Sequence, residues 1–308
     1  MSRPPSTEFS SSAVQQRYLG RSTLLSDYWA LTKPEVNFLI LITTFAGFYL
    51  ASARDGRFSF AGLFNTLFGT LLVASGTGAL NQYLERKVDA QMRRTARRPA
   101  AAGRLTPTAV LAFGTALTLT GSIYLGIAVN LLASVLATLT LLTYLFVYTP
   151  LKRRTPLCTL IGAFPGAIPP LIGWAAASGS LTLQAWTLYA LLFLWQFPHF
   201  MAIAWMYRED YDRAGYLVLP PDGGARLRFV NCQTLVPLLA LTPLSLLPGL
   251  ACASRASYWI GAVFLSLGFL YYGTLFVLNK SGASAGRLLA ASIVYLPSLF
   301  VLIILPRG

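Results

Sequence analysis

Nine long apolar segments, separated by polar stretches, constrain this chain more than any other feature of its sequence. A helix needs about 20 mostly apolar residues to cross the hydrocarbon layer of a membrane. The segments cover residues 35–53, 60–83, 107–124, 128–148, 157–177, 183–207, 229–250, 257–279 and 287–306. Lipid offers the backbone no hydrogen-bond partner, and the segments lack the alternating pattern of a membrane β-barrel, so each is expected to be helical. The predicted fold class is all-α, a polytopic membrane bundle of nine transmembrane helices.

The composition is that of a protein that folds in lipid. Of the 308 residues, 55% are hydrophobic and only 11% are charged, and the mean hydropathy is +0.60. A water-soluble domain is normally about a quarter charged. We expect residues 1–33 to form a polar cytoplasmic N-terminal segment and residues 34–308 to form one membrane domain. The N-terminal segment has no apolar core, which argues against a cleaved secretory signal.

The net charge of +14 does not require a nucleic-acid partner, because the basic residues follow the topology. If the N-terminus is cytoplasmic, 20 of the 24 basic residues fall on the cytoplasmic side, and the four exceptions are Arg54, Arg57, Arg255 and Arg307. Such an asymmetry is what the positive-inside rule describes. We therefore predict an integral membrane protein with its N-terminus inside and its C-terminus outside, and we assign it to a bacterial plasma membrane. A short organellar transit peptide is the alternative, which Glu8 and Asp27 weaken.

The first candidate site follows the second apolar segment. Asn81, Glu85, Asp89 and Arg93 are spaced by four residues, so they share one face if the helix continues past the membrane. Mg²⁺ prefers oxygen ligands and usually keeps substrate phosphates in its shell, and arginines supply forked donors to phosphate oxygens. Acids are rare in this chain, which favours a metal site for the first three residues. The arginines alone are more typical of a solvated helix end with topology-setting charges.

Two further charged groups are expected on the same side of the membrane. Residues 208–213 carry Glu209, Asp210 and Asp212, and we predict Asp210 as a ligand, whereas Glu209 and Asp212 could simply pair with neighbouring arginines. Residues 148–155 include Tyr148, Lys152 and Arg153. This group could complete an anion site, although a stop-transfer anchor is equally basic.

His199 is the single histidine and lies in an apolar helix. A lone histidine in such a place is usually a packing residue. Pro198, just before it, frees a backbone carbonyl and kinks the helix where a bulky ligand could fit. Neutral imidazole is a standard axial ligand of haem iron.

Together these segments resemble a known family. The pattern Asn81-xxx-Glu85-xxx-Asp89-xx-Met92-Arg93-Arg94-Thr95-xx-Arg98-Pro99 is similar to the first aspartate-rich motif of the protohaem IX farnesyltransferases, a branch of the membrane aromatic prenyltransferase superfamily. The likeness continues through residues 148–155, 168–174, 195–200 and 208–220. It covers most of the chain from residue 31 onward, and residues 195–200 separate the haem branch from quinone-making relatives.

The resemblance implies roles for individual residues. Asn81, Glu85, Asp89 and Asp210 would form the catalytic group, in which Glu85, Asp89 and Asp210 would hold Mg²⁺ or another divalent cation. Substrate-binding residues would be Arg93, Arg94, Arg98, Lys152, Arg153, Tyr148 and His199, with His199 orienting haem. The family usually has Asp where this chain has Glu85, so the carboxylate reaches one methylene further.

The implied reaction transfers a farnesyl group from farnesyl diphosphate to the vinyl group of haem B, a substrate rather than a cofactor, and gives haem O. The implied partners are both substrates, the lipid bilayer, and haem A synthase or the assembly of a terminal oxidase. Two alternatives remain open at this point. One is a sister prenyltransferase acting on a quinone precursor or a chlorophyll-like ring, and the other is a non-catalytic haem carrier or transporter.

Overall fold

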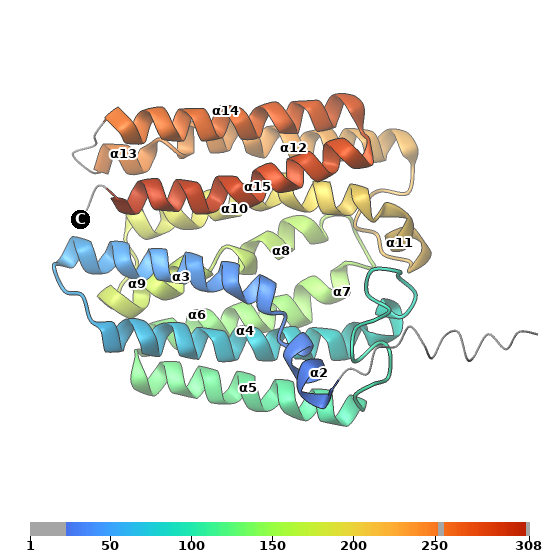
Figure 1. The fold of residues 1–308 in the computed structure, drawn as a ribbon, viewed down its shortest axis with the longest axis horizontal. Helices are drawn as coiled ribbons and strands as arrows, with labels where there is room; N and C mark the ends of the chain where they lie inside the picture. The colour runs from blue at the N-terminus through green and yellow to red at the C-terminus, as the bar shows by residue number, and fades with distance from the viewer. Residues whose placement is uncertain (1–22, 252–255, 306–308) are drawn as a thin grey trace, which may run out of the picture.

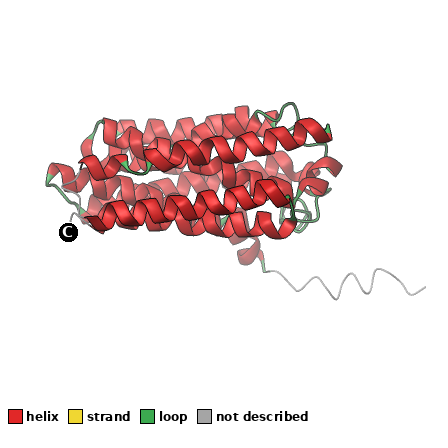
Figure 2. Ribbon diagram, turned by 90° about the horizontal axis from the view of Figure 1, so that it is seen from above, coloured by secondary structure: helices red, strands yellow, loops and turns green. Residues whose placement is uncertain are grey.

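A computed structural model describes residues 23–251 and 256–305. Within these ranges the chain folds as helices without strands, and the long helices run side by side along one axis (Figures 1 and 2). The elements are α2 (Leu24–Leu31), α3 (Pro34–Asp55), α4 (Phe60–Asp89), α5 (Pro107–Ala128), α6 (Leu131–Leu142), the π-helix η1 (Thr143–Tyr148), α7 (Thr149–Leu151), α8 (Cys158–Gly166), α9 (Pro169–Ser178), α10 (Leu183–Met206), α11 (Arg208–Arg213), α12 (Gly223–Leu244), α13 (Leu247–Ala251), α14 (Ala256–Asn279) and α15 (Gly282–Ile304). All nine expected spans are found in the described part of the chain, which confirms the all-α fold class.

Three helices extend five or six residues beyond the apolar segments that predicted them. Helix α4 continues to Asp89, and α12 and α15 begin at Gly223 and Gly282, each five or six residues early. The Asp222 carboxylate caps α12 by accepting from the backbone amides of residues 224 and 225, and Ser281 caps α15. Helix ends depend on such caps as well as on hydropathy, so the apolar runs gave the spans but not all of their boundaries.

Prolines shape the fourth and fifth spans. The fifth is divided into α8 and α9 before Pro169 and Pro170, since neither proline has an amide hydrogen with which to continue the hydrogen-bond ladder of α8. In the fourth span, residues 143–148 form the wider π-helix η1 before Pro150, and the Thr149 hydroxyl donates to the Tyr144 carbonyl at 2.9 Å. This local widening delivers Tyr148 and Thr149 to the end of α4.

Two glycines allow α3 and α9 to pack backbone against backbone. A Cβ atom added at Gly47 would lie 2.1 Å from the carbonyl oxygen of Pro170, and one added at Gly173 would lie 1.9 Å from that of Thr44. Small residues at helix contacts are the usual way that membrane helices approach closely. Only glycine fits at either position.

The bundle has an apolar interior and an apolar outer surface. Trp174, Phe269 and Tyr295 are fully buried in the core that joins α3, α9, α10, α12, α14 and α15. On the outside, Ile127 is 84% and Phe264 is 76% exposed. Water-soluble proteins rarely expose so much apolar surface, so this surface suits contact with lipid.

The two ends of the bundle differ. The end of α4, α7, α11 and the short helix α2 gather at one end, whereas α15 finishes at the other (Figure 1). Helix α2 is held against α4 because the Gln82 amide donates to the carbonyl oxygens of Ala30 and Leu31. Residues 1–22 of the N-terminal segment expected from the sequence lie outside the described residues.

Candidate active site

The rare acidic residues singled out in the sequence gather at one end of the bundle. Asn81, Glu85 and Asp89 lie on one face of α4, as their spacing predicted, and all three are buried. Asp210, from α11, is buried at the same end. Because α4 ends at Asp89, Arg93 lies beyond the helix and is exposed, so the predicted stripe does not extend to it.

Glu85 is the most heavily bonded acid of the site. Its Oε1 accepts from the Lys152 ammonium and from the Tyr216 hydroxyl, each at 2.8 Å, and its Oε2 accepts from the Asn81 amide at 2.9 Å. The Asn81 oxygen in turn accepts from the Lys33 ammonium at 2.7 Å. Three side chains from separate parts of the chain, Lys33, Lys152 and Tyr216, thus hold one carboxylate and its neighbouring amide in place.

Asp89 is held differently, by one cation and with one oxygen free. Its Oδ2 forms an ion pair with Arg98 at 2.8 Å. Its Oδ1 is buried and lacks a hydrogen-bond partner in the described part of the chain. A buried unsatisfied carboxylate oxygen is costly unless it serves a purpose, and a cation is what this atom can receive.

Asp210 connects the second acidic cluster to the loop after α4. Its Oδ2 accepts from the backbone amide of Arg94 at 3.2 Å, and its Oδ1 pairs with Arg213 at 3.1 Å. The Arg94 guanidinium lies over the Tyr207 ring, 5.0 Å from its centroid. The bond between Arg94 and Asp210 joins residues 116 positions apart, so the two clusters lie beside each other.

The remaining predicted residues are arranged less closely. Glu209 is exposed and pairs with Arg208 at 3.6 Å, the pairing that the sequence left open. Asp212 instead forms two 3.0 Å bonds to Arg226. Arg153 is exposed. These side chains are not assembled with the buried carboxylates.

Lys152 and Tyr148 do join the site. The Lys152 ammonium forms an ion pair with Glu85 and also lies 4.6 Å from the centroid of the Tyr148 ring. Burial by itself would lower the pKa of Lys152, but Tyr148 and Glu85 outweigh it and raise this pKa well above its ordinary value. Lys152 therefore remains a cation at any pH at which the protein works.

Sequence reasoning missed Lys33 and Tyr216. Burial, reinforced by the charge of Arg98, lowers the pKa of Lys33 to about 7. Lys33 also has a left-handed backbone, with φ of 54°, a strained conformation that in non-glycine residues often marks a functional position. Tyr216 follows the turn at Gly215, which also has positive φ. Its position inside the similar segment 208–220 was the one available signal.

The donor set fits a divalent cation that a diphosphate completes. Within the described residues, no three His, Cys, Asp or Glu side chains lie close enough to hold a metal by themselves. The free Oδ1 of Asp89 supplies an oxygen ligand, and Lys33, Arg98 and Lys152 supply positive charge around it. Mg²⁺ commonly uses one or two carboxylates plus substrate phosphates, which is the arrangement these residues offer.

His199 lies deeper in the bundle, on α10. Seven residues separate it from the end of that helix at Met206, about 10 Å at the usual rise. Its ring stacks on Trp195, with centroids 4.7 Å apart, and its Nδ1 lies 2.8 Å from the Ser292 hydroxyl of α15. Because the Ser292 hydroxyl donates to the Leu289 carbonyl, Nδ1 must be the donor. Neutral His199 then keeps the lone pair on Nε2.

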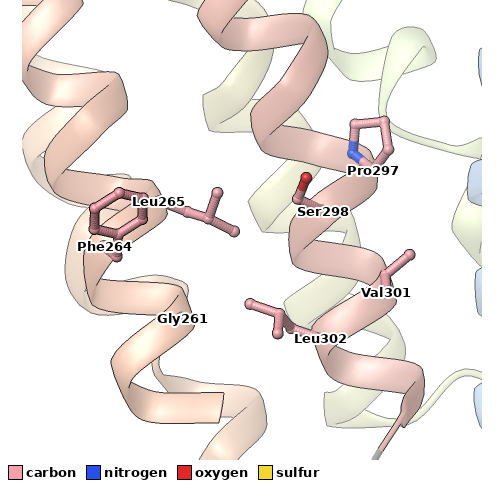
Figure 3. Close-up of a pocket in the computed structure, with 7 residues that line it drawn as sticks. All are labelled: Gly261, Phe264, Leu265, Pro297, Ser298, Val301 and Leu302. Carbon is pink, nitrogen blue, oxygen red and sulfur yellow. The ribbon is translucent and has the colours of Figure 1, made fainter. Parts of the chain in front are cut away.

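An apolar groove between α14 and α15 is separate from this site. Phe264 and Leu265 face Pro297, Val301 and Leu302 across it (Figure 3). It lies toward the far ends of both helices from the buried acids and contains no titratable side chain. We regard it as part of the lipid-facing surface.

The chain is similar to known proteins along nearly its whole length. The model of the UbiA prenyltransferase family matches residues 40–299. Three similar relatives are named protoheme IX farnesyltransferase. The one from Solibacter usitatus is 45% identical, covering 92% of this chain and 99% of the relative. Those from Salinibacter ruber and Koribacter versatilis are 42% and 40% identical, covering 91% and 94% of this chain and 98% and 95% of the relatives.

Solved structures share the fold at lower identity. A structure described as digeranylgeranylglyceryl phosphate synthase has a TM-score of 0.72 at 18% identity, covering 92% of this chain and 98% of that one. A UbiA homologue from Archaeoglobus fulgidus, bound to GPP and Mg²⁺, has a TM-score of 0.56 at 15% identity, with coverage of 90% and 99%. With nine membrane-spanning helices in its described part and these relatives, the chain is an integral membrane enzyme that belongs to the UbiA prenyltransferase family, among the protohaem IX farnesyltransferases.

Proposed function

We propose that this chain transfers the farnesyl group of farnesyl diphosphate to the vinyl group of haem B, which gives haem O for haem–copper terminal oxidases. The observation that carries the proposal is the gathering of buried carboxylate, amide and cationic side chains at one end of an otherwise apolar bundle. The names of the relatives support the substrates, and the Mg²⁺ and prenyl diphosphate in the Archaeoglobus homologue support a divalent cation.

The charged end would bind the diphosphate. Lys33, Lys152 and Arg98 surround Asn81, Glu85 and Asp89, and Arg94 stands beside Asp210. We assign Asp89, Glu85 and Asp210 to hold the divalent cation together with the diphosphate, since in the described part of the chain these side chains are not close enough to hold it by themselves. Asn81 lies beside Glu85. When bound, such a cation neutralises charge on the departing diphosphate. The basic side chains do the same from the protein, and Arg93 and Arg153 would attract the anion from the exposed rim.

The apolar part of the bundle would hold the reacting carbons away from water. In the proposed reaction the C1–O bond of farnesyl diphosphate breaks, and its electron pair leaves with the diphosphate. The terminal vinyl carbon of haem B then bonds to C1, a water molecule adds to the inner vinyl carbon, and a proton is released. Preorganised cations stabilise the charge that develops on the leaving group. Tyr148, at the end of η1, would border the site beside Lys152.

Haem would lie toward the middle of the bundle, where His199 can orient it. Ser292 and Trp195 fix the imidazole from two sides, and the lone pair on Nε2 is suited to an iron ligand. A distance of about 10 Å along α10 separates this position from the charged end, so a haem placed there and a diphosphate at the helix end would approach each other.

We propose that the site faces the cytoplasm of a bacterial cell. The basic loops after α4, around α7 and after α11 all lie at the end that carries the site (Figure 1), which the positive-inside rule places inside. Residues 1–33 would then be a cytoplasmic segment, residues 34–308 the membrane domain, and the C-terminus would lie outside. Haem A synthase or an oxidase assembly factor would take the product.

The test is product analysis by mass spectrometry after the purified protein is incubated with haem B, farnesyl diphosphate and Mg²⁺, with a parallel sample in EDTA. We expect haem O only in the sample with metal. If folded protein formed no haem O but prenylated a quinone precursor, it would be a sister prenyltransferase. If it bound haem and formed no prenylated product from either acceptor, it would be a haem carrier or transporter.

A further inference from the structure

Glu85 is one methylene longer than Asp89, the next acid on the same face of α4, and Tyr216 is placed to hold its carboxylate. Glu has one more rotatable bond than Asp, so a buried Glu loses more side-chain freedom when its carboxylate is fixed. The Tyr216 hydroxyl donates to Glu85 Oε1 at 2.8 Å. This bond joins residues 131 positions apart.

Tyr216 is itself rigidly held. Its side chain is 5% exposed and packs with Met92 and Ala214. Its amide donates to the Tyr211 carbonyl, and the next amide, of Leu217, donates to the Lys152 carbonyl at 2.7 Å. The phenol therefore comes from a segment that is also fixed to the second donor on Glu85 Oε1. Such a donor can orient a carboxylate rather than follow it.

We propose that Tyr216 is a positioning residue for Glu85: its hydroxyl sets the direction of the longer carboxylate so that Glu85 serves the diphosphate site as a shorter Asp would. The inference rests on the proposed function, because it concerns the same diphosphate site. It links Tyr216 to the identity of residue 85, so the requirement for the hydroxyl should disappear when residue 85 is Asp, whose carboxylate lies one methylene further from the phenol.

The experiment is a double-mutant cycle with a binding readout. The full-length protein in lipid nanodiscs is titrated with a non-reactive farnesyl thiolodiphosphate in the presence of Mg²⁺, without haem, and binding is measured calorimetrically. We expect Tyr216→Phe to weaken binding about tenfold, the value of one hydrogen bond to a charged group. In the Glu85→Asp background, the same change should alter binding less than about twofold, because the shorter carboxylate does not depend on the phenol.

Tyr124→Phe is the matched control. The Tyr124 hydroxyl donates to Asn65 Oδ1 at 2.8 Å, between α4 and α5 and away from the site. This variant also loses one phenol hydrogen bond, here to a neutral amide oxygen, so it should lower thermal stability and leave the affinity for the analogue unchanged. If removal of a phenol acted only through the fold, Tyr216→Phe and Tyr124→Phe would both weaken binding, and the proposal would be overturned.

The remaining outcomes are also distinguishable. Equal weakening by Tyr216→Phe in the unmodified protein and in the Glu85→Asp variant would show that Tyr216 does not act through residue 85, and the inference would be wrong. Unchanged binding in Tyr216→Phe would refute it as well, with the proposed function intact. If the unmodified protein failed to bind the analogue with Mg²⁺, the proposed function itself would fail first.

Discussion

Removing Lys152 should destabilise the protein because it leaves Glu85 charged and buried. The two side chains are 13% and 7% exposed, and their charged atoms are 2.8 Å apart. At an effective dielectric constant of 20, that separation corresponds to about 6 kcal/mol of attraction. Desolvation consumes much of this, but removal of one partner of a buried pair typically costs about 3–5 kcal/mol.

For Lys152→Met we expect the lower end of that range, about 3 kcal/mol, because Asn81 and Tyr216 still donate to the carboxylate. Glu85→Gln should cost a similar amount by leaving the ammonium without its counter-ion. The double variant should lose much less than the sum of the two single losses, since no unpaired charge remains. Unfolding by denaturing detergent, followed by circular dichroism, measures all three free energies. Additive losses would refute the reasoning, because independent side chains do not couple.

Three further changes test other parts of the structure. Asp89→Asn should lower metal-dependent haem O formation at least about 100-fold, because it weakens the one buried carboxylate oxygen that is free to bind a cation in the described part of the chain. Product is measured by mass spectrometry with protein shown to be folded. Near-normal turnover would exclude Asp89 as a ligand. Ser292→Ala should weaken haem binding about tenfold in a Soret titration by releasing the imidazole, and an unchanged affinity would remove that role. Gly173→Ala should cost at least about 1–3 kcal/mol of stability, because its Cβ would meet a backbone oxygen at 1.9 Å, whereas Gly268→Ala, with nothing within 4 Å, should not.

A pH dependence follows from Lys33. The pKa of this buried ammonium is lowered to about 7, whereas in the unfolded chain it would be about 10.4. Between these values the unfolded chain binds more protons than the folded one, so stability should rise with pH from about 7 to about 10. Lys33→Met should flatten this rise in detergent-unfolding measurements made across that range. A slope that is the same in both proteins would assign the titration to another group.

The sequence by itself determined the nine spans, because a helix in lipid must satisfy its own backbone and needs only a sufficient apolar length. It also indicated the stripe of Asn81, Glu85 and Asp89, since a spacing of four residues is a local property of a helix. It did not give the break before Pro169 or the early start of α12 at Gly223, which depend on backbone geometry and capping.

Only the tertiary structure decided which groups meet these residues. Lys33 reaches Asn81 across 48 positions, and Tyr216 reaches Glu85 across 131. The last helix, in which the sequence analysis predicted no site residue, supplies the hydroxyl of Ser292 to His199. Hydropathy records how long each helix is and which parts of it avoid water. It carries no information on how the helices are rotated or ordered around one another, and that arrangement brings Lys152 and Tyr216, from two other segments, to the carboxylate of Glu85.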